Sequence, residues 1–141
     1  MVVALYKRTS LSRIERLTLA VPLDYASFML TVAETAFYLK KAGRLLSHAE
    51  RDQIITFLSR RPKAGVLLRG TGGIRKLRWG KDGQGKSSGV RVIYYFHSDV
   101  MPLYLVTMFG KNEQSDLTAE QCNQLADLTE QLRLIWVRKK R

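Results

Sequence analysis

Three basic side chains on two short segments are the first candidates for chemistry in this sequence. Apolar and polar residues alternate over 74–79 and again over 90–96, which predicts two β-strands. Side chains two positions apart in a strand project from the same face, so Lys76 and Arg78 share one face of the first strand. If the second strand pairs with the first as a hairpin, Arg91 can join them and one face carries three cations.

A cluster of cations suits the chemistry of phosphate esters. Cleavage of RNA through its own 2′-hydroxyl requires removal of the 2′ proton, stabilisation of an anionic phosphorane and protonation of the departing 5′ oxygen. Lysine and arginine supply the second requirement directly, and a lysine crowded by other cations loses its proton more easily, which permits the first. These residue types are equally consistent with a nuclease and with a non-catalytic RNA-binding protein. A solvated basic loop without a ligand is the simplest alternative.

The basic residues are concentrated around these two segments. The chain has 24 Lys and Arg against 12 Asp and Glu, a net charge of +12. Residues 60–91 contain ten Lys or Arg and a single acid, Asp82, so this stretch carries +9 of that charge. Such a local excess favours a polyanionic partner such as nucleic acid or an acidic protein.

Motifs for other chemistries are missing from the sequence. The glycine cluster at 70–73 has neither the following GK[ST] of a phosphate-binding loop nor GxGxxG spacing. His48 and His97 lie far apart, and Asp82 alone is a poor magnesium site. The single cysteine, Cys122, excludes an internal disulfide and fits a reducing cytosol. We therefore expect no metal and no cofactor, and the absence of a long apolar run indicates no membrane association.

The elements that must position the cations follow from periodicity and capping signals. We expect a short strand at 28–32, a helix at 33–41 and a second helix that begins at a capping box over 47–50. An apolar strand at 102–109 precedes a last helix, which begins at another capping box over 118–121. This order predicts an α+β fold: two N-terminal helices, an antiparallel twisted sheet and a C-terminal helix, with the helices on one sheet face and the basic residues on the other.

The first residues show no clear pattern. We expect the folded domain to span 29–141 and residues 1–28 to form an extension. This extension is either poorly ordered or lies upstream of a true translation start at Met29. Pro22 interrupts any element within it, and it lacks the apolar region and small-residue cleavage site of a signal peptide.

Three ordered motifs resemble toxins of type II toxin–antitoxin pairs. They are GTGGIRKLRW at 70–79, SGVRVIYYF at 88–96 and LYLVTMFGKNEQSDLT at 103–118. The resemblance is to the RelE/ParE superfamily, within it to the HigB-like branch, and it covers about residues 34–130. It implies a RelE-like fold, with two N-terminal helices, an antiparallel sheet and a C-terminal helix.

The same resemblance implies an activity and a set of site residues. RelE-like members cut mRNA in the ribosomal A site, where the ribosome aligns the substrate. By that likeness Lys76 or Arg78 assists 2′-hydroxyl deprotonation, Arg91 binds the scissile phosphate, and Lys111 holds the backbone or the leaving group. The predicted catalytic residues are therefore Lys76, Arg78, Arg91 and Lys111. The predicted RNA contacts are Arg75, Lys81, Lys86, Tyr95 and Asn112.

Two positions depart from the RelE pattern. Asn112 stands where RelE has a second arginine, and Thr118 stands where it has a tyrosine. The candidates for the general acid are Lys111, Lys76, Tyr95 and, more weakly, His97. The ParE branch shares the fold but poisons gyrase without cutting RNA, so a non-catalytic member, a gyrase poison or an RNA-binding module, is the alternative function.

The resemblance also implies partners. We expect a cognate helix-turn-helix antitoxin, mRNA in the ribosomal A site, contact with promoter DNA only through the antitoxin, and a cytoplasmic location. Other residues have simpler expected roles. Tyr94, Tyr104 and Trp79 are expected to pack in the fold, and Glu113 to bridge to a cation and hold the 110–113 segment in place.

Overall fold

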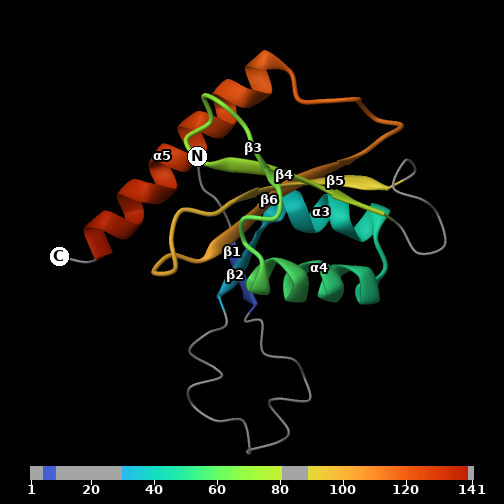
Figure 1. The fold of residues 1–141 in the computed structure, drawn as a ribbon, viewed down its shortest axis with the longest axis horizontal. Helices are drawn as coiled ribbons and strands as arrows, with labels where there is room; N and C mark the ends of the chain where they lie inside the picture. The colour runs from blue at the N-terminus through green and yellow to red at the C-terminus, as the bar shows by residue number, and fades with distance from the viewer. Residues whose placement is uncertain (1–4, 9–29, 81–88, 140–141) are drawn as a thin grey trace, which may run out of the picture.

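The computed structural model describes residues 5–8, 30–80 and 89–139, which form a six-stranded sheet with three helices (Figure 1). The helices are α3 (Ala36–Leu45), α4 (His48–Arg60) and α5 (Ala119–Lys139). The strands are β1 (Leu5–Arg8), β2 (Val32–Thr35), β3 (Val66–Leu67), β4 (Ile74–Trp79), β5 (Val90–Tyr95) and β6 (Leu103–Gly110). The predicted α+β class is confirmed.

The sheet is mixed, so the prediction of a wholly antiparallel sheet is wrong at one strand pair. The strand order is β1-β2-β6-β5-β4-β3, and β2 pairs with β6 in parallel while the other pairs are antiparallel. A parallel pair requires a long crossover connection. Here the chain leaves β2 through α3 and α4 and returns through β3, β4 and β5, which brings β6 back beside β2 in the same direction.

Strand β1 lies within the segment that we expected to be an extension. It pairs antiparallel with β2, with Leu5 opposite Thr35 and Arg8 opposite Val32. The expected boundary at residue 28 thus leaves an edge strand of this sheet outside the domain. Met29, the expected alternative start, lies outside the described residues.

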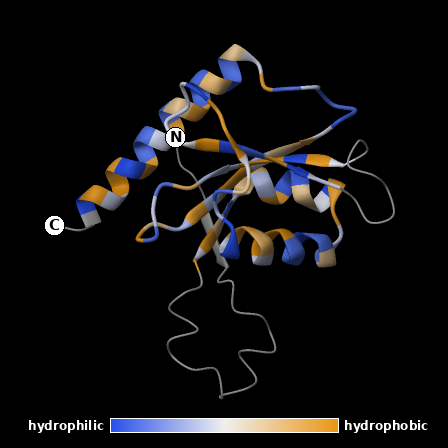
Figure 2. Cartoon of the chain, in the orientation of Figure 1, coloured by the Kyte–Doolittle hydropathy of each residue, from blue (hydrophilic) through white to orange (hydrophobic). Residues whose placement is uncertain are grey.

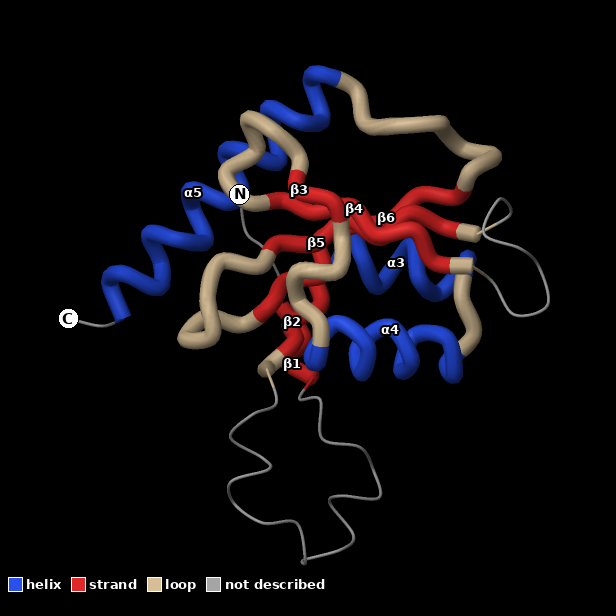
Figure 3. The backbone as a smooth tube through the Cα atoms, viewed as in Figure 1, coloured by secondary structure: helices blue, strands red, loops and turns tan. Residues whose placement is uncertain are grey.

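Helices cover both faces of the sheet (Figure 3), which differs from the expectation of helices on one face. The α3–α4 face is closed by a core that includes Tyr38, Ile54, Leu58, Val92 and Leu105. The α5 face is closed by a core that includes Ile74, Ile93, Tyr95, Leu125, Leu128 and Leu132. The sheet therefore has no face that is left to basic residues alone.

The C-terminal helix reaches the sheet because its apolar side chains recur at helical spacing. Leu125, Leu128 and Leu132 lie on one side of α5 and are buried. Figure 2 shows the corresponding alternation of hydrophobic and hydrophilic residues along this helix. No helix in the described ranges combines the length and the apolar character that crossing a membrane requires.

Both predicted capping boxes are present. In α4 the Ser47 backbone N–H donates to Glu50 Oε1 at 3.0 Å, and the Glu50 N–H donates to Ser47 Oγ at 3.1 Å. At the start of α5 the equivalent distances between Thr118 and Gln121 are 2.9 and 3.1 Å. Each cap contributes about 1 kcal/mol, and the second determines where the polar segment after β6 turns into α5.

The first helix begins later than predicted. Thr35 is its N-cap: the Thr35 hydroxyl accepts from Tyr38 N–H at 3.1 Å and donates to Val106 O at 2.5 Å. The residues before Thr35 are held as strand β2 by pairing with β6, from Val32 opposite Leu103 onward. Tertiary pairing therefore overrides the helical pattern that predicted a start at residue 33.

Candidate nucleic-acid interface

The β4–β5 hairpin brings three predicted catalytic cations to one face. In its register Arg78 lies directly opposite Arg91, and Lys76 lies opposite Ile93. Ile93 belongs to the core beneath α5, so all three cations project from the α5 face of the sheet. Directly opposed residues of an antiparallel pair have Cβ atoms about 4.5–5.5 Å apart, which places both guanidinium groups within reach of one phosphate.

Within the described residues, neither arginine takes part in a salt bridge. Arg78 is exposed, while Arg91 is half-buried and its Nη1 has no hydrogen-bond partner among the described residues. Like charges directly opposite one another across two strands are destabilising. An anion between Arg78 and Arg91 would relieve this repulsion and accept hydrogen bonds from their guanidinium groups.

Lys76 has a carboxylate partner that sequence reasoning missed. Its Nζ donates to Asp116 Oδ1 at 3.0 Å, and the same oxygen accepts from the Leu117 backbone N–H at 2.8 Å. The hydrogen bond from Lys76 is the main cause that lowers the pKa of Asp116, and the Leu117 N–H and the charge of Arg91 lower it further. The carboxylate is therefore ionised at neutral pH and lies beside the cation cluster.

The segment that carries Asp116 is tied down on both sides. Glu113 binds Lys41 Nζ of α3 at 2.6 Å and lies 3.9 Å from Arg44, and the Lys41 hydrogen bond is the main cause that lowers the pKa of Glu113. Gln114 Nε2 donates to Asp116 O at 2.8 Å and to Gln121 Oε1 at 3.0 Å. The expectation that Glu113 bridges to a cation is confirmed, and this largely hydrophilic segment crosses from β6 to α5 in Figure 2.

Lys111 and Asn112 follow directly after β6 and are exposed. The last residue of β6, Gly110, pairs with Val90 at the start of β5. The turn that holds Lys111 therefore begins at the same end of the sheet as Arg91. The structure brings this fourth predicted catalytic residue to the neighbourhood of the cluster, on an adjacent turn.

Arg75, a predicted RNA contact, lies on the other face of β4 from Lys76 and Arg78. Its Nη1 donates to Gly65 O at 2.9 Å and to Lys63 O at 3.2 Å. It thus supports the turn between α4 and β3. Because successive side chains of a strand point to opposite faces, Arg75 projects to the face opposite Lys76.

Tyr95, another predicted RNA contact, is buried in the fold. Its side chain is only 1% exposed, in the core beneath α5, with its ring edge-on to His97 at 6.3 Å between centroids. Burial raises the pKa of Tyr95. The remaining predicted RNA contacts, Lys81 and Lys86, lie outside the described residues.

Two further tyrosines pack in the fold, as predicted. The Tyr94 hydroxyl accepts from Gly65 N–H at 2.8 Å and donates to Pro62 O at 2.7 Å. The Tyr104 hydroxyl accepts from Trp136 Nε1 at 2.5 Å, which joins β6 to α5. Desolvation raises the pKa of both tyrosines, Tyr94 and Tyr104.

The glycine cluster before β4 is a turn that docks on α5. Gly72 has φ +75°, and a Cβ there would lie 2.6 Å from Thr129 Oγ1. That hydroxyl donates to Thr71 O at 2.8 Å. The motif needs glycine for backbone conformation and close approach, and it fixes α5 against the end of β4 that is far from Arg78.

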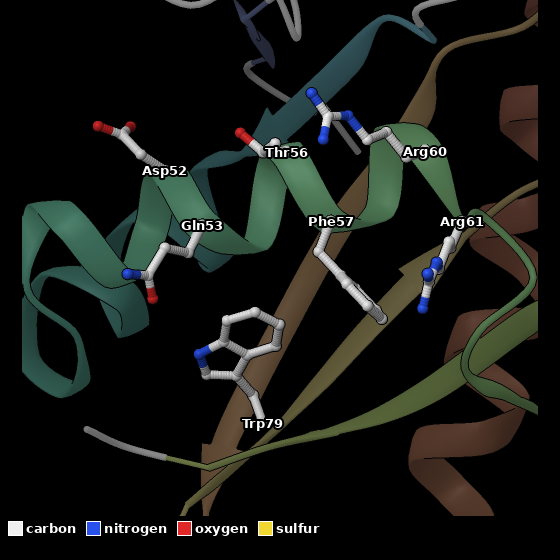
Figure 4. A pocket seen from close by; sticks show the side chains of 7 residues that line it. All are labelled: Asp52, Gln53, Thr56, Phe57, Arg60, Arg61 and Trp79. Atoms are coloured by element: carbon white, nitrogen blue, oxygen red, sulfur yellow. The ribbon is translucent and has the colours of Figure 1, made fainter. Parts of the chain in front are cut away.

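A hollow between α4 and β4 lies on the opposite face of the sheet from the cation cluster (Figure 4). Phe57 of α4 and Trp79 of β4 meet edge to face with ring centroids 5.7 Å apart, and the Arg61 guanidinium lies 5.8 Å from the Phe57 centroid. The predicted packing role of Trp79 is confirmed. The hollow is lined by Asp52, Gln53, Thr56, Phe57, Arg60, Arg61 and Trp79, and it includes no predicted catalytic residue.

On the α5 face, the described groups that could take part in chemistry are the cations of Lys76, Arg78 and Arg91 and the carboxylate of Asp116. Within residues 5–8, 30–80 and 89–139, no group of three or more His, Cys, Asp or Glu side chains is arranged to hold a metal ion. No model of a known protein family matches this chain.

Proposed function

We propose that this chain is the toxin of a type II toxin–antitoxin pair, an endoribonuclease of RelE-like fold that cleaves mRNA on the ribosome. The observation that carries the proposal is the cross-strand pair of Arg78 and Arg91, with Lys76 two residues further along the same face. The α+β class of the structure supports the proposal at the level of fold class. The motif resemblance at 70–79, 88–96 and 103–118 adds the expectation of RNA cleavage.

The proposed reaction is an RNA transesterification that needs no metal. The 2′ oxygen attacks phosphorus as its proton leaves, the bond from phosphorus to the 5′ oxygen breaks, and that oxygen takes up a proton. The products are a 2′,3′-cyclic phosphate and a 5′-hydroxyl. Lys76 or Arg78 assists removal of the 2′ proton, Arg91 binds the scissile phosphate, and Lys111 holds the backbone or the leaving oxygen.

The cations act mainly by stabilising charge. The phosphorane carries more negative charge than the ground-state diester, so donors already in place around it bind the transition state more strongly than the substrate. Loss of one such donor lowers turnover about 100-fold to 1,000-fold in other enzymes. A half-buried guanidinium that lies opposite a second arginine, as at Arg91, suits this role.

Induction of the chain in bacterial cells, followed by mapping of mRNA ends, tests the proposal. We expect growth arrest and cuts at codon spacing, which disappear in Arg91→Ala. Arg60→Ala is the matched control, because it removes an exposed positive charge from α4 on the other face of the sheet. Intact mRNA with DNA damage would instead support a gyrase poison, and normal growth with intact mRNA would contradict both.

The proposed regulation follows from the same function. A cytoplasmic helix-turn-helix antitoxin would bind this chain, suppress its activity and carry the complex to promoter DNA. Co-expression with such a partner, encoded beside the toxin, is expected to restore growth. Continued arrest in the presence of a stable complex would contradict this arrangement.

A further inference from the structure

We propose that Asp116 is an internal counter-ion whose carboxylate occupies, in the free protein, the place of an RNA phosphate beside Lys76 and Arg91. An incoming phosphate displaces it. This inference rests on the proposed function only in that the α5 face binds RNA. It assigns a role to a residue that belongs to none of the predicted sites.

The position of Asp116 supports this role. Its Oδ1 is 3.0 Å from Lys76 Nζ, and the charge of Arg91 also acts on it. A phosphodiester oxygen carries the same kind of charge and accepts the same N–H donors. The carboxylate therefore makes the contacts that a phosphate would make at Lys76, and among the described residues it leaves Arg78 and Arg91 without a direct anionic partner.

The contact is readily reversible. The side chain of Asp116 is 62% exposed, whereas that of Lys76 is only 23% exposed. Ion pairs open to solvent contribute about 0–1 kcal/mol. An RNA phosphate that also engages the two arginines gains more than the displaced pair loses.

Displacement does not require the segment after β6 to unfold. Glu113 remains anchored to Lys41 on α3, and the Thr118–Gln121 capping box remains in place at the start of α5. Asp116 lies between these two anchors. Rotation of one exposed side chain is enough to open the site.

Removal of the Asp116 charge should therefore strengthen RNA binding. Asp116→Asn keeps an oxygen that can accept from Leu117 N–H but removes the competing anion. We expect affinity for single-stranded RNA to rise about threefold to tenfold. In this variant Lys76 pairs with a salt anion in the free protein and releases it when RNA binds. The slope of the logarithm of the association constant against the logarithm of the salt concentration should therefore become steeper by about 0.7.

The probe is a single-stranded 2′-O-methyl RNA oligonucleotide, which binds but cannot be cleaved. Affinity is measured for the full chain across a series of salt concentrations. Glu130→Gln is the matched control, because it makes the same charge change at an exposed acid of α5 that pairs with Arg133. We expect its affinity and salt slope to stay close to those of the wild type.

A double variant isolates the contact. In the Lys76→Gln background, Asp116→Asn is expected to bring less than half of its usual gain in affinity, since the cation that it releases is gone. If Asp116 had a purely structural role, the effect of Asp116→Asn on RNA affinity would not depend on Lys76. Thermal unfolding of each variant checks that the fold is retained.

Several results would overturn the inference. They are equal or weaker binding by Asp116→Asn, an equal gain in Glu130→Gln, an undiminished gain in the Lys76→Gln background, and no binding by either the wild type or Asp116→Asn. The proposed nuclease is tested separately by cleavage on ribosomes. If the chain shows the expected binding changes but leaves mRNA intact, the counter-ion role of Asp116 is supported and the proposed nuclease activity is contradicted.

Discussion

The two faces of strand β4 use their basic residues in opposite ways. On the α4 side, the Arg75 guanidinium donates to two backbone carbonyls of the 62–65 turn. On the α5 side, Arg78 is exposed and faces Arg91, whose Nη1 lacks a partner in the described ranges. A cation that hydrogen-bonds carbonyls stabilises the fold, whereas two cations that repel one another are stabilised by binding an anion. The difference separates a structural arginine from candidate binding arginines on a single strand.

The adjacent tyrosines of β5 are both structural, but they stabilise the fold in different ways. Tyr94, on the α4 side, bonds both Pro62 O and Gly65 N–H and holds the same turn as Arg75. Tyr95, on the cation side, is buried under α5, and its hydroxyl has no hydrogen bond within the described ranges. The α5 face is therefore divided into a core half beneath the helix and a cationic half beyond it.

The largest expected effect on the fold comes from Arg75→Ala. It leaves the carbonyls of Lys63 and Gly65 without their charged donor, so we expect a loss of about 2–3 kcal/mol in the free energy of unfolding. RNA affinity measured below the unfolding transition should change little. A loss of RNA binding without a loss of stability would break the comparison between the two faces.

Tyr94→Phe should come next in size. The variant removes the hydroxyl that serves two backbone groups, with an expected destabilisation of about 2 kcal/mol. Tyr95→Phe is its control on the neighbouring residue and should alter stability by less than about 0.5 kcal/mol. Chemical denaturation measures both, and a greater loss in Tyr95→Phe would contradict the assignment of the two hydroxyls.

Arg78→Ala should weaken RNA binding and leave the stability of the fold nearly unchanged. We expect affinity for single-stranded RNA to fall about tenfold, equivalent to roughly 1.4 kcal/mol, and the salt slope to become shallower by about 0.7. Stability should stay within about 0.5 kcal/mol of the wild type, because the side chain is exposed. Filter binding over a salt series, with Arg60→Ala as control, measures the difference. Equal losses in both variants would indicate only a response to net charge.

The smallest expected effect concerns the anchor at Glu113. Its pKa is lowered in the folded chain, mainly by the Lys41 hydrogen bond. A lowered carboxyl pKa adds stability above the usual glutamate range, and this is lost as pH falls through the folded pKa. At pH 7 we expect Glu113→Gln to have a free energy of unfolding lower than that of the wild type by under about 1 kcal/mol. At acid pH this difference in stability should become smaller. Thermal melts from pH 7 to about pH 3, with Glu120→Gln as control, measure this. A difference that grows on acidification would contradict the contact.

Much of the local structure was predictable. Alternation with period two predicted that Lys76 and Arg78 share a face, and the box residues Ser47 and Glu50 predicted the start of α4. The placement of α5 over the cation face was not predictable in this way. The apolar stripe of that helix shows that it must pack, but it does not show against which face of the sheet.

The sequence by itself determined the patterns that depend on near neighbours: strand alternation, helix caps, and the local excess of positive charge between residues 60 and 91. Tertiary structure alone decided that Arg78 lies opposite Arg91, that Arg75 supports a turn, and that Asp116 reaches Lys76 across 40 positions of the chain. Local patterns follow from the geometry of a few consecutive residues. Register and contacts between distant segments follow from how the whole core packs, and no short stretch of sequence contains that information.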